Sequence, residues 1–371
     1  MIIILFKRYI FRLYPNKQQE ELIQKTFGCA RFVYNQALAH RQKVYEETKE
    51  KLSRFDCINW ATRFLKNNYS WLKEPDSRAL NSSIEDMDIA YQRFFQGISN
   101  FPKFKSKRGR QSYRTNSSSI KISFEQNKIK LPKLKWVRCK CHRTFEGKIK
   151  SATIIQKPSK KYFVSILVET EHVPLPIKNN DKAVGFDLGI KDFLITSDGD
   201  KIENPKYFKK YQNKLAKEQR KFAHKQKGSK NFQKQKIKVT RVHEKIFNSR
   251  KDFLHKVSHK LIYENQIIVS ENLDVSEMLK NPRLAKQISD CSWSEFVQQL
   301  EYKALWNNRI YIKVDKYFKS SQTCCVCGFI NLNVKNLAIR KWQCPKCETL
   351  HDRDINAAKN ILKEGLRIIN S

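Results

Sequence analysis

The chain has 371 residues, of which 40% are hydrophobic and 12% aromatic, so it can build more than one core and is not a disordered polymer. Lys and Arg number 74 against 36 Asp and Glu, which gives a formal net charge of +38. Such an excess needs a polyanionic partner. Nucleic acid fits, and a membrane partner is disfavoured because no apolar run approaches the ~20 residues of a spanning helix.

The first half of the chain divides into a helical part and a β-rich part. Met1–Phe6 reads as a buried strand, and apolar residues recur at helical spacing between Gln18 and His40, after a turn at Pro15–Lys17. Residues 101–150 hold 16 Lys and Arg against 2 acidic residues and begin with an aromatic-rich basic loop, Phe101–Arg110. Strand-like runs at 120–122, 128–131 and 162–168 then predict a small barrel or sheet.

The second half has the mixed strand and helix pattern of an α/β domain. Pro174–Lys182 is the best candidate linker. Residues 206–260 form a long helical stretch, interrupted near Gly228–Ser229, with 19 Lys and Arg against 3 acidic residues. So one-sided a charge favours a phosphate-facing surface over an ordinary solvated helix face. The other predicted elements are strands at 183–188, 193–196, 267–270 and 310–314 and a helix at 293–306.

Four of the ten cysteines have the spacing of a zinc site. Cys324 and Cys327 form one Cys-x-x-Cys pair, and Cys344 and Cys347 form a second pair after sixteen intervening residues. Two such pairs on tight turns aim four thiolates at one tetrahedral ion, which predicts a single structural Zn²⁺ rather than a redox pair. Cys325, inside the first pair, is not expected to be a ligand.

A second cysteine cluster carries less weight. Cys139-x-Cys141-His142 could ligate a metal, but strand-like residues flank it and no fourth ligand is in reach, so a structural role is favoured. The remaining cysteines are scattered, and the opening apolar run is too short for the core of a signal peptide. We therefore expect a reduced, intracellular location, in the cytoplasm or nucleoid.

Three carboxylates lie at the ends of predicted strands or at the start of a predicted helix. Asp187 ends the apolar run Val184–Leu188, Glu271 follows the run Ile267–Ser270, and Asp354 begins an Ala-rich helix. One carboxylate after a strand is usually a cap or turn residue. Three in one α/β region match the need of a phosphodiester nuclease, in which clustered carboxylates hold two divalent ions.

With these motifs the sequence resembles the TnpB family, transposon-encoded RNA-guided nucleases regarded as ancestors of type V CRISPR effectors. The motif His351–Asp354, together with the zinc ribbon, is the most specific part of the resemblance. The matching segments run nearly end to end: Phe6–Arg8, Tyr14–Pro15, Phe27–Asn35, Ala90–Phe95, Phe101–Lys107, Arg250–His255, Ser321–Cys324 and His351–Asp354.

The resemblance implies a multidomain α/β architecture. Its expected parts are a β-barrel wedge domain (1–10 and 111–175) interrupted by a helical recognition domain (11–110), then a RuvC-like nuclease domain of RNase H fold (181–320 and 349–371) with an inserted zinc ribbon (321–348). In this family the catalytic triad matches Asp187, Glu271 and Asp354, with two Mg²⁺ ions as expected cofactors. The presence of all three acids argues against the nuclease-inactive relatives.

The resemblance also implies partners: a guide RNA from the end of the element and a double-stranded target DNA beside a short adjacent motif, with one chain per RNA rather than two. The basic loop and the basic helices are the expected backbone contacts. The candidate contact residues are Arg78, Ser82, Lys103, Lys105, Lys107, Arg108, Thr115, Asn116, Arg250 and Lys251, of which Arg78, Ser82, Thr115 and Asn116 lie in the segments expected to read the adjacent motif.

Two other functions remain open from the sequence. One is a nuclease-inactive, RNA-guided DNA binder that regulates transposition. The other is an unguided zinc-ribbon DNA-binding protein or transposase, which would join strands rather than only cut them. A defined co-purifying RNA and metal-dependent cleavage separate the three.

Overall fold

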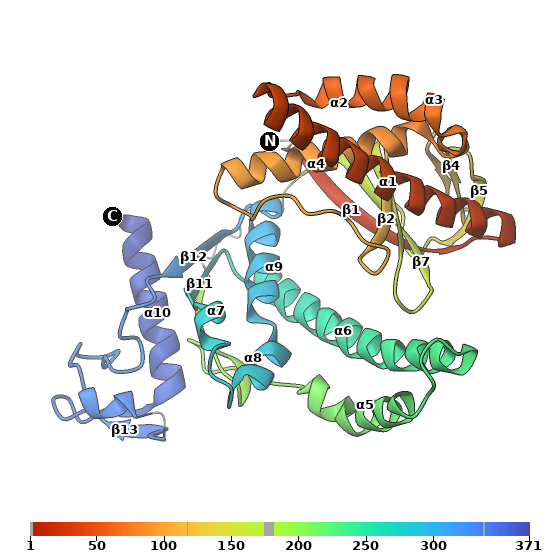
Figure 1. Cartoon of the computed structure of the whole chain (residues 1–371). Coiled ribbons are helices and arrows are strands. Elements are labelled where there is room, and N and C mark those ends of the chain that lie inside the picture. The colour runs from red at the N-terminus through yellow and green to blue at the C-terminus, as the bar shows by residue number, and fades with distance from the viewer. Residues whose placement is uncertain (1–2, 117, 174–181, 337) are drawn as a thin grey trace. The chain divides into compact units, whose positions relative to one another are not determined.

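The computed structural model describes residues 3–116, 118–173, 182–336 and 338–371, which belong to two compact units (Figure 1). One unit ends at His172 and the other begins at Val173. Apart from Lys182, the predicted linker Pro174–Lys182 lies outside the described residues. No helix in the described ranges is both long and apolar enough to cross a membrane.

The first unit is built on a seven-stranded antiparallel sheet of order β2-β6-β7-β1-β5-β4-β3. Its strands are β1 (Ile3–Tyr14), β2 (Gln111–Thr115), β3 (Lys121–Ser123), β4 (Lys128–Leu131), β5 (Lys135–Lys140), β6 (Lys148–Gln156) and β7 (Tyr162–His172). Strand β1 continues past residue 10, the expected domain boundary, because Phe11 and Leu13 still point into the core. In the described residues β2 and β3 are the end strands, whereas a closed barrel would pair them.

Helices join this sheet through α1. The helical elements are α1 (Lys17–Thr48), α2 (Arg54–Trp60), a π-helix (Ala61–Leu65), α3 (Lys66–Asn68), a 3₁₀ turn (Ser70–Lys73) and α4 (Ser77–Phe95). Asn16 and Gln19 form a capping box that starts α1. The first half of α1 buries Phe27 against the sheet, and its second half buries Leu38 against Met87 of α4. One amphipathic helix therefore serves both cores.

The second unit contains a five-stranded mixed sheet of order β10-β9-β8-β11-β12. Its strands are β8 (Ala183–Leu188), β9 (Asp192–Thr196), β10 (Lys201–Glu203), β11 (Ile267–Glu271) and β12 (Ile310–Val314). Strands β8, β11 and β12 are parallel, and β9 and β10 are antiparallel to their neighbours. The carboxyl ends of β8 and β11 consequently meet at one edge of the sheet.

Helices pack on this sheet through two separate cores. The helices are α5 (Tyr207–Ala223), α6 (Lys230–Glu264), α7 (Val275–Met278), α8 (Ala285–Cys291), α9 (Trp293–Trp306) and α10 (Arg353–Asn370). Leu254 of α6 and Phe296 of α9 share one core with Phe186 of β8, and Ile361 of α10 shares the other with Val269 of β11. The predicted break between α5 and α6 is confirmed: Gly228 has φ +87° and Ser229 caps α6.

Candidate functional site

The four predicted zinc ligands converge. One ligand atom from each of Cys324, Cys327, Cys344 and Cys347 lies within 4.8 Å of all the others. Two matching turns deliver them: the amide of Gly328 donates to the carbonyl of Cys324, and the amide four residues after Cys344 donates to the Cys344 carbonyl, both at 2.9 Å. Four thiolates at this separation fit a structural Zn²⁺. Cys325 lies outside the group, as expected.

Neighbouring side chains support this cysteine cluster. His351 is buried, with Nε2 3.1 Å from Sγ of Cys324 and its ring 4.6 Å from the ring of Trp342. Hydrogen bonds from the hydroxyl and backbone of Thr349 lower the pKa of Cys347 to about 6. The contacts from Thr349 favour the thiolate form of Cys347, the form that zinc requires.

The three carboxylates are delivered by two strands and a helix. Asp187 lies near the end of β8 and Glu271 ends β11; the preceding residues, Phe186 and Ser270, are register partners on these parallel strands. Asp354 is the second residue of α10, which packs on both strands. The sheet edge and the start of one helix therefore hold all three acids.

A close helix–sheet contact fixes Asp354 beside Asp187. A Cβ at Gly185 would lie 2.5 Å from the carbonyl oxygen of Ala358 and 2.6 Å from Leu362, so only glycine fits there. Asp187 lies two residues after Gly185, and Asp354 lies one helical turn before Ala358. This approach of backbone to backbone brings the two acids near enough for the charge of Asp354 to raise the pKa of Asp187.

Electrostatics show that the acids repel one another. Burial, followed by the charges of Glu271 and Asp354, raises the pKa of Asp187 well above its usual value. Burial also raises the pKa of Glu271, and a hydrogen bond from Ser320 opposes that shift. A divalent cation would relieve both the burial cost and the repulsion, so these carboxylates could hold one.

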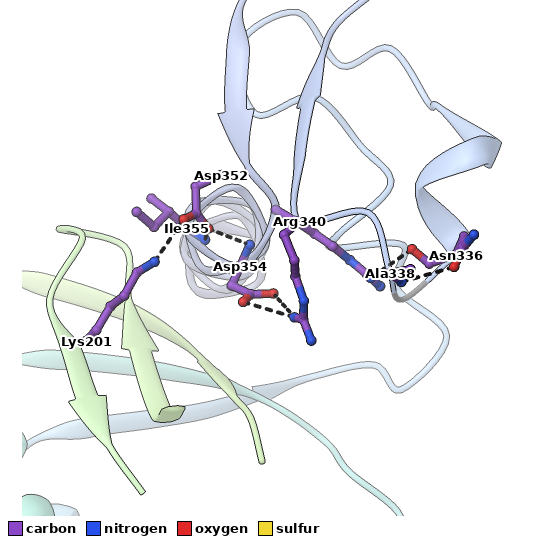
Figure 2. A network of polar contacts seen from close by, with 8 residues as sticks. Lys201, Asn336, Ala338, Arg340, Asp352, Asp354 and Ile355 are labelled. Atoms are coloured by element: carbon purple, nitrogen blue, oxygen red, sulfur yellow. Dashed lines mark hydrogen bonds and ion pairs between the residues drawn. The ribbon is translucent and has the colours of Figure 1, made fainter. Parts of the chain in front are cut away.

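Cations and hydrogen-bond donors already engage these acids. Both carboxylate oxygens of Asp354 accept hydrogen bonds of 3.2 Å from Nη1 of Arg340, a residue between the two cysteine pairs (Figure 2). Asp352 caps α10 by accepting from the amide of Asp354 and is paired with Lys201 at 2.8 Å. The three acids lie farther apart than the cysteines. In the described ranges, the four cysteines are the group whose ligand atoms all lie within 4.8 Å of one another.

Arg340 and Ser320 were missed by sequence reasoning. Arg340 directly precedes the short strand β13 (Lys341–Gln343) and belongs to no recognisable motif, and Ser320 precedes the first cysteine pair. Their proximity to the acids depends on how the ribbon folds back on α10. The carbonyl of Arg340 accepts from the amide of Arg353 at 2.9 Å, which fixes this return.

The cysteine pair of the first unit does not form a comparable cluster. Sγ of Cys139 lies 3.2 Å from Sγ of Cys141, and Asn127 holds the backbone of Cys141. Cys139 is buried in the core of the sheet, which raises the pKa of its thiol. In the described part of the chain no third metal ligand joins the pair.

The basic loop is held on α1 by Lys105. Its amide donates to Asn35 Oδ1 at 2.8 Å, its carbonyl accepts from Asn35 Nδ2 at 3.0 Å, and its ammonium stands 3.8 Å from the centre of the Tyr34 ring. Lys105 therefore anchors the loop. Its neighbours Lys103, Lys107 and Arg108 are exposed and open to a polyanion.

The two segments expected to read the adjacent motif come together around Asp76. Its carboxylate accepts from the amide of Arg78 at 3.2 Å and from the hydroxyl of Thr115 at 2.5 Å. Arg78 and Asn116 are exposed, but Ser82 and Thr115 are 1% exposed, so these two support the surface rather than contact DNA directly. The expectation for Ser82 and Thr115 is corrected because α4 packs on β2 there.

The basic helices α5 and α6 border a cleft, and α6 carries the two expected contact residues Arg250 and Lys251. The cleft between α5 and α6 has a volume of about 340 Å³ and is lined by Tyr211, Lys214, Glu218, Lys238, Arg241, Val242 and Lys245. Arg250 is half-buried and donates to the carbonyl of Ser289 at 2.7 Å, so it ties α6 to α8. Lys251 is also half-buried.

Three family models match the chain. They are described as "Probable transposase" (residues 165–282), "Cas12f1-like, TNB domain" (residues 293–361) and "Helix-turn-helix domain" (residues 1–50). The second match contains all four zinc-ligand cysteines. Over the third, the structure has the strand β1 and the single long helix α1.

Curated relatives match almost the whole chain. A protein of Streptomyces pristinaespiralis is 36% identical over 97% of this chain and 89% of its own length, and InsQ of Escherichia coli (strain K12) is 34% identical over 97% and 92%. Both carry the description "Putative RNA-guided DNA endonuclease". TnpB-like protein L79 of Acanthamoeba polyphaga mimivirus is 26% identical over 96% of this chain.

A solved structure shares the fold. The cryo-EM structure of a Cas12f1–sgRNA–target DNA complex matches 96% of this chain and 98% of its own chain, with a TM-score of 0.60 at 13% sequence identity. The chain thus shares the fold of that Cas12f1 chain.

Proposed function

The chain belongs to the TnpB-like family of RNA-guided DNA endonucleases, and we propose that it cuts target DNA by metal-dependent hydrolysis at Asp187, Glu271 and Asp354. The observation that carries this proposal is electrostatic: after burial, the charges of Glu271 and Asp354 are what raise the pKa of Asp187, at the sheet edge where β8 and β11 end beside the start of α10. An acid that served only to cap a strand or helix would not need two other carboxylates close enough to raise its pKa.

In this proposal the three carboxylates hold two Mg²⁺ ions, which supply Lewis-acid activation of water and stabilise the departing oxygen. Arg340 neutralises Asp354 in the chain alone. If Asp354 held a cation, the guanidinium of Arg340 would be free to donate to a phosphate oxygen of the strand being cut. Gly185 keeps α10 close enough for Asp354 to take part.

We assign the four cysteines to one structural zinc ion that folds residues 321–348 as a ribbon. All coordination positions are then filled by protein, so the ion takes no part in hydrolysis. The ribbon's contribution is to place Arg340 against the acids.

The proposed partners are a guide RNA and a double-stranded DNA target, with one chain per RNA. The net charge of +38 supports polyanion binding, and the α5–α6 cleft, with Lys238 and Lys245 beside Tyr211, suits a sugar–phosphate backbone. Base pairing would read the target, and the exposed Arg78 and Asn116 are our candidates for reading the adjacent motif.

Sequencing the RNA that co-purifies with the chain, expressed with its native flanking DNA, is the first test. A single abundant RNA with a variable end segment supports the proposal and provides the guide for a Mg²⁺-dependent cleavage assay. Binding of the target without cleavage would favour an inactive, guided regulator. Random RNA or none would favour an unguided DNA-binding protein, and a strand-transfer assay on element ends would then test for a transposase.

A further inference from the structure

Ser320 connects the zinc ribbon to the carboxylate site. It lies four residues before Cys324, is 5% exposed, and its hydroxyl donates to Oε1 of Glu271. A donor on one carboxylate oxygen fixes the rotation of the side chain and leaves the other oxygen for a cation. Ser320 thus defines which way Glu271 presents its free oxygen.

Two buried asparagines of α10 hold the segment that carries Ser320. Nδ2 of Asn360 donates to the carbonyl of Ser320 at 2.8 Å and to that of Thr323 at 2.5 Å. Asn356 donates to the same Thr323 carbonyl at 2.7 Å and accepts from the amide of Cys325 at 2.9 Å. The helix that carries Asp354 in its first turn therefore also fixes residues 320–325.

The other end of this segment is a zinc ligand. Cys324 belongs to the four-thiolate cluster, and His351, just before α10, lies against its sulfur. Four thiolates within 4.8 Å of one another are held by an ion and repel without one. Loss of zinc would release the segment at Cys324, and with it the hydroxyl on Glu271.

We propose that Ser320 is a positioning residue for Glu271, and that the zinc ribbon sets the geometry of the carboxylate site through the segment 320–325. This inference rests on the proposed function, because it takes the three acids to be the divalent-metal site. It assigns the structural zinc a defined effect on catalysis: zinc fixes Cys324, the segment fixes Ser320, and Ser320 orients Glu271.

The test measures Mn²⁺ binding to the full chain without RNA, by calorimetry, and the Mg²⁺ dependence of cleavage by the RNA complex. Ser320→Ala is expected to weaken Mn²⁺ binding about tenfold, the lower range for a hydrogen bond to a charged group. The half-saturating Mg²⁺ concentration should rise by a similar factor, with a smaller loss of rate at saturating Mg²⁺. Ser320→Thr, which keeps the hydroxyl, should restore both values.

Ser276→Ala is the matched control, because the Ser276 hydroxyl also donates to a carboxylate, that of Asp274, at 2.6 Å on the exposed α7. It should leave Mn²⁺ binding unchanged. Asn360→Ala should weaken Mn²⁺ binding in the same direction as Ser320→Ala, and the double variant should be no weaker than Ser320→Ala alone, because both act through one contact. Chelation of zinc should weaken Mn²⁺ binding in the wild type and add nothing to Ser320→Ala.

Unchanged Mn²⁺ binding in Ser320→Ala would overturn the inference, whatever happens to cleavage. Additive effects of zinc removal and Ser320→Ala would also overturn it, as would a Ser320→Thr variant as weak as Ser320→Ala. The proposed function fails in a different way. If Asp187→Ala binds Mn²⁺ as well as the wild type does, the acids are not the metal site at all.

Discussion

The four cysteines of the ribbon come from residues 324 to 347, whereas the three carboxylates come from residues 187 to 354 and from three different elements. The cysteines are already within 4.8 Å of one another on two local turns. The acids rely on a strand pairing, a helix packed against a glycine, and contacts from Arg340 and Ser320. The cysteine site needs one short segment of the chain and its ion, but the dispersed carboxylate site depends on the whole domain around it.

The two sites also differ in what an ion does for them. Zinc is expected to fold the ribbon outright, since four thiolates have no other reason to gather. At the acids the polypeptide gathers the ligands first and tolerates their repulsion. The difference predicts that changes at the acids alter chemistry and leave the fold, while changes at the cysteines alter the fold of the ribbon and, through it, chemistry.

The largest effect is expected from Asp187→Ala. Removal of this ligand should reduce cleavage by at least about a thousandfold, because the charge that holds the ions is lost. Guide RNA binding should persist, and the unfolding transition should not move down, since the variant removes a carboxylate that the neighbouring acids repel and whose pKa is raised in the folded chain. Asp198→Ala is the control, an exposed acid in the turn after β9. Loss of RNA binding in Asp187→Ala would show that Asp187 is structural.

A similarly clear result is expected from Cys344→Ser. This chain should lose the zinc ion, about one per chain in the wild type by elemental analysis, because three thiolates and a hydroxyl bind zinc weakly. Residues 321–348 should then become susceptible to proteolysis. Cys141→Ser, in the cysteine pair of the first unit, should keep both the zinc and the protease resistance. Zinc loss on Cys141→Ser would identify a second site that the described geometry does not contain.

Local features of the molecule were predictable from the sequence, and features that depend on distant residues were not. The bounds of β4, β8, β12 and α9 agree with the predicted runs, and the cysteine ligands were evident from spacing alone. Arg340, Ser320 and the burial of Thr115 were not predictable in this way. Each depends on residues distant in the chain, and neither propensity nor periodicity encodes which distant backbone a polar side chain will meet.

Gly185→Ala tests the helix–sheet contact that brings the acids together. A methyl group would overlap the carbonyl of Ala358, so the second unit should lose about 1–3 kcal/mol of stability in denaturant unfolding. Cleavage should fall because Asp354 moves with α10. Gly28→Ala, in α1, is the matched control: no atom lies within 4 Å of its added Cβ, and the helix should gain up to about 1 kcal/mol. Equal responses of the two variants would show that the contact of Gly185 with α10 does not bring the acids together.

The smallest effect, and the sharpest comparison of the two sites, is expected from Arg340→Ala. Without the guanidinium of Arg340, Asp354 is freer to bind a cation, so the RNA-free chain should bind Mn²⁺ a few-fold more tightly. Cleavage should nevertheless slow about tenfold or more, because a donor to the phosphate is lost. Lys201→Ala removes a neighbouring ion pair, with Asp352, and should change neither value beyond about twofold. Tighter metal binding with slower cleavage would mean that the ribbon contributes a group to the reaction. If metal binding and cleavage weakened together, Arg340 would instead be a positioning residue that holds Asp354 in place.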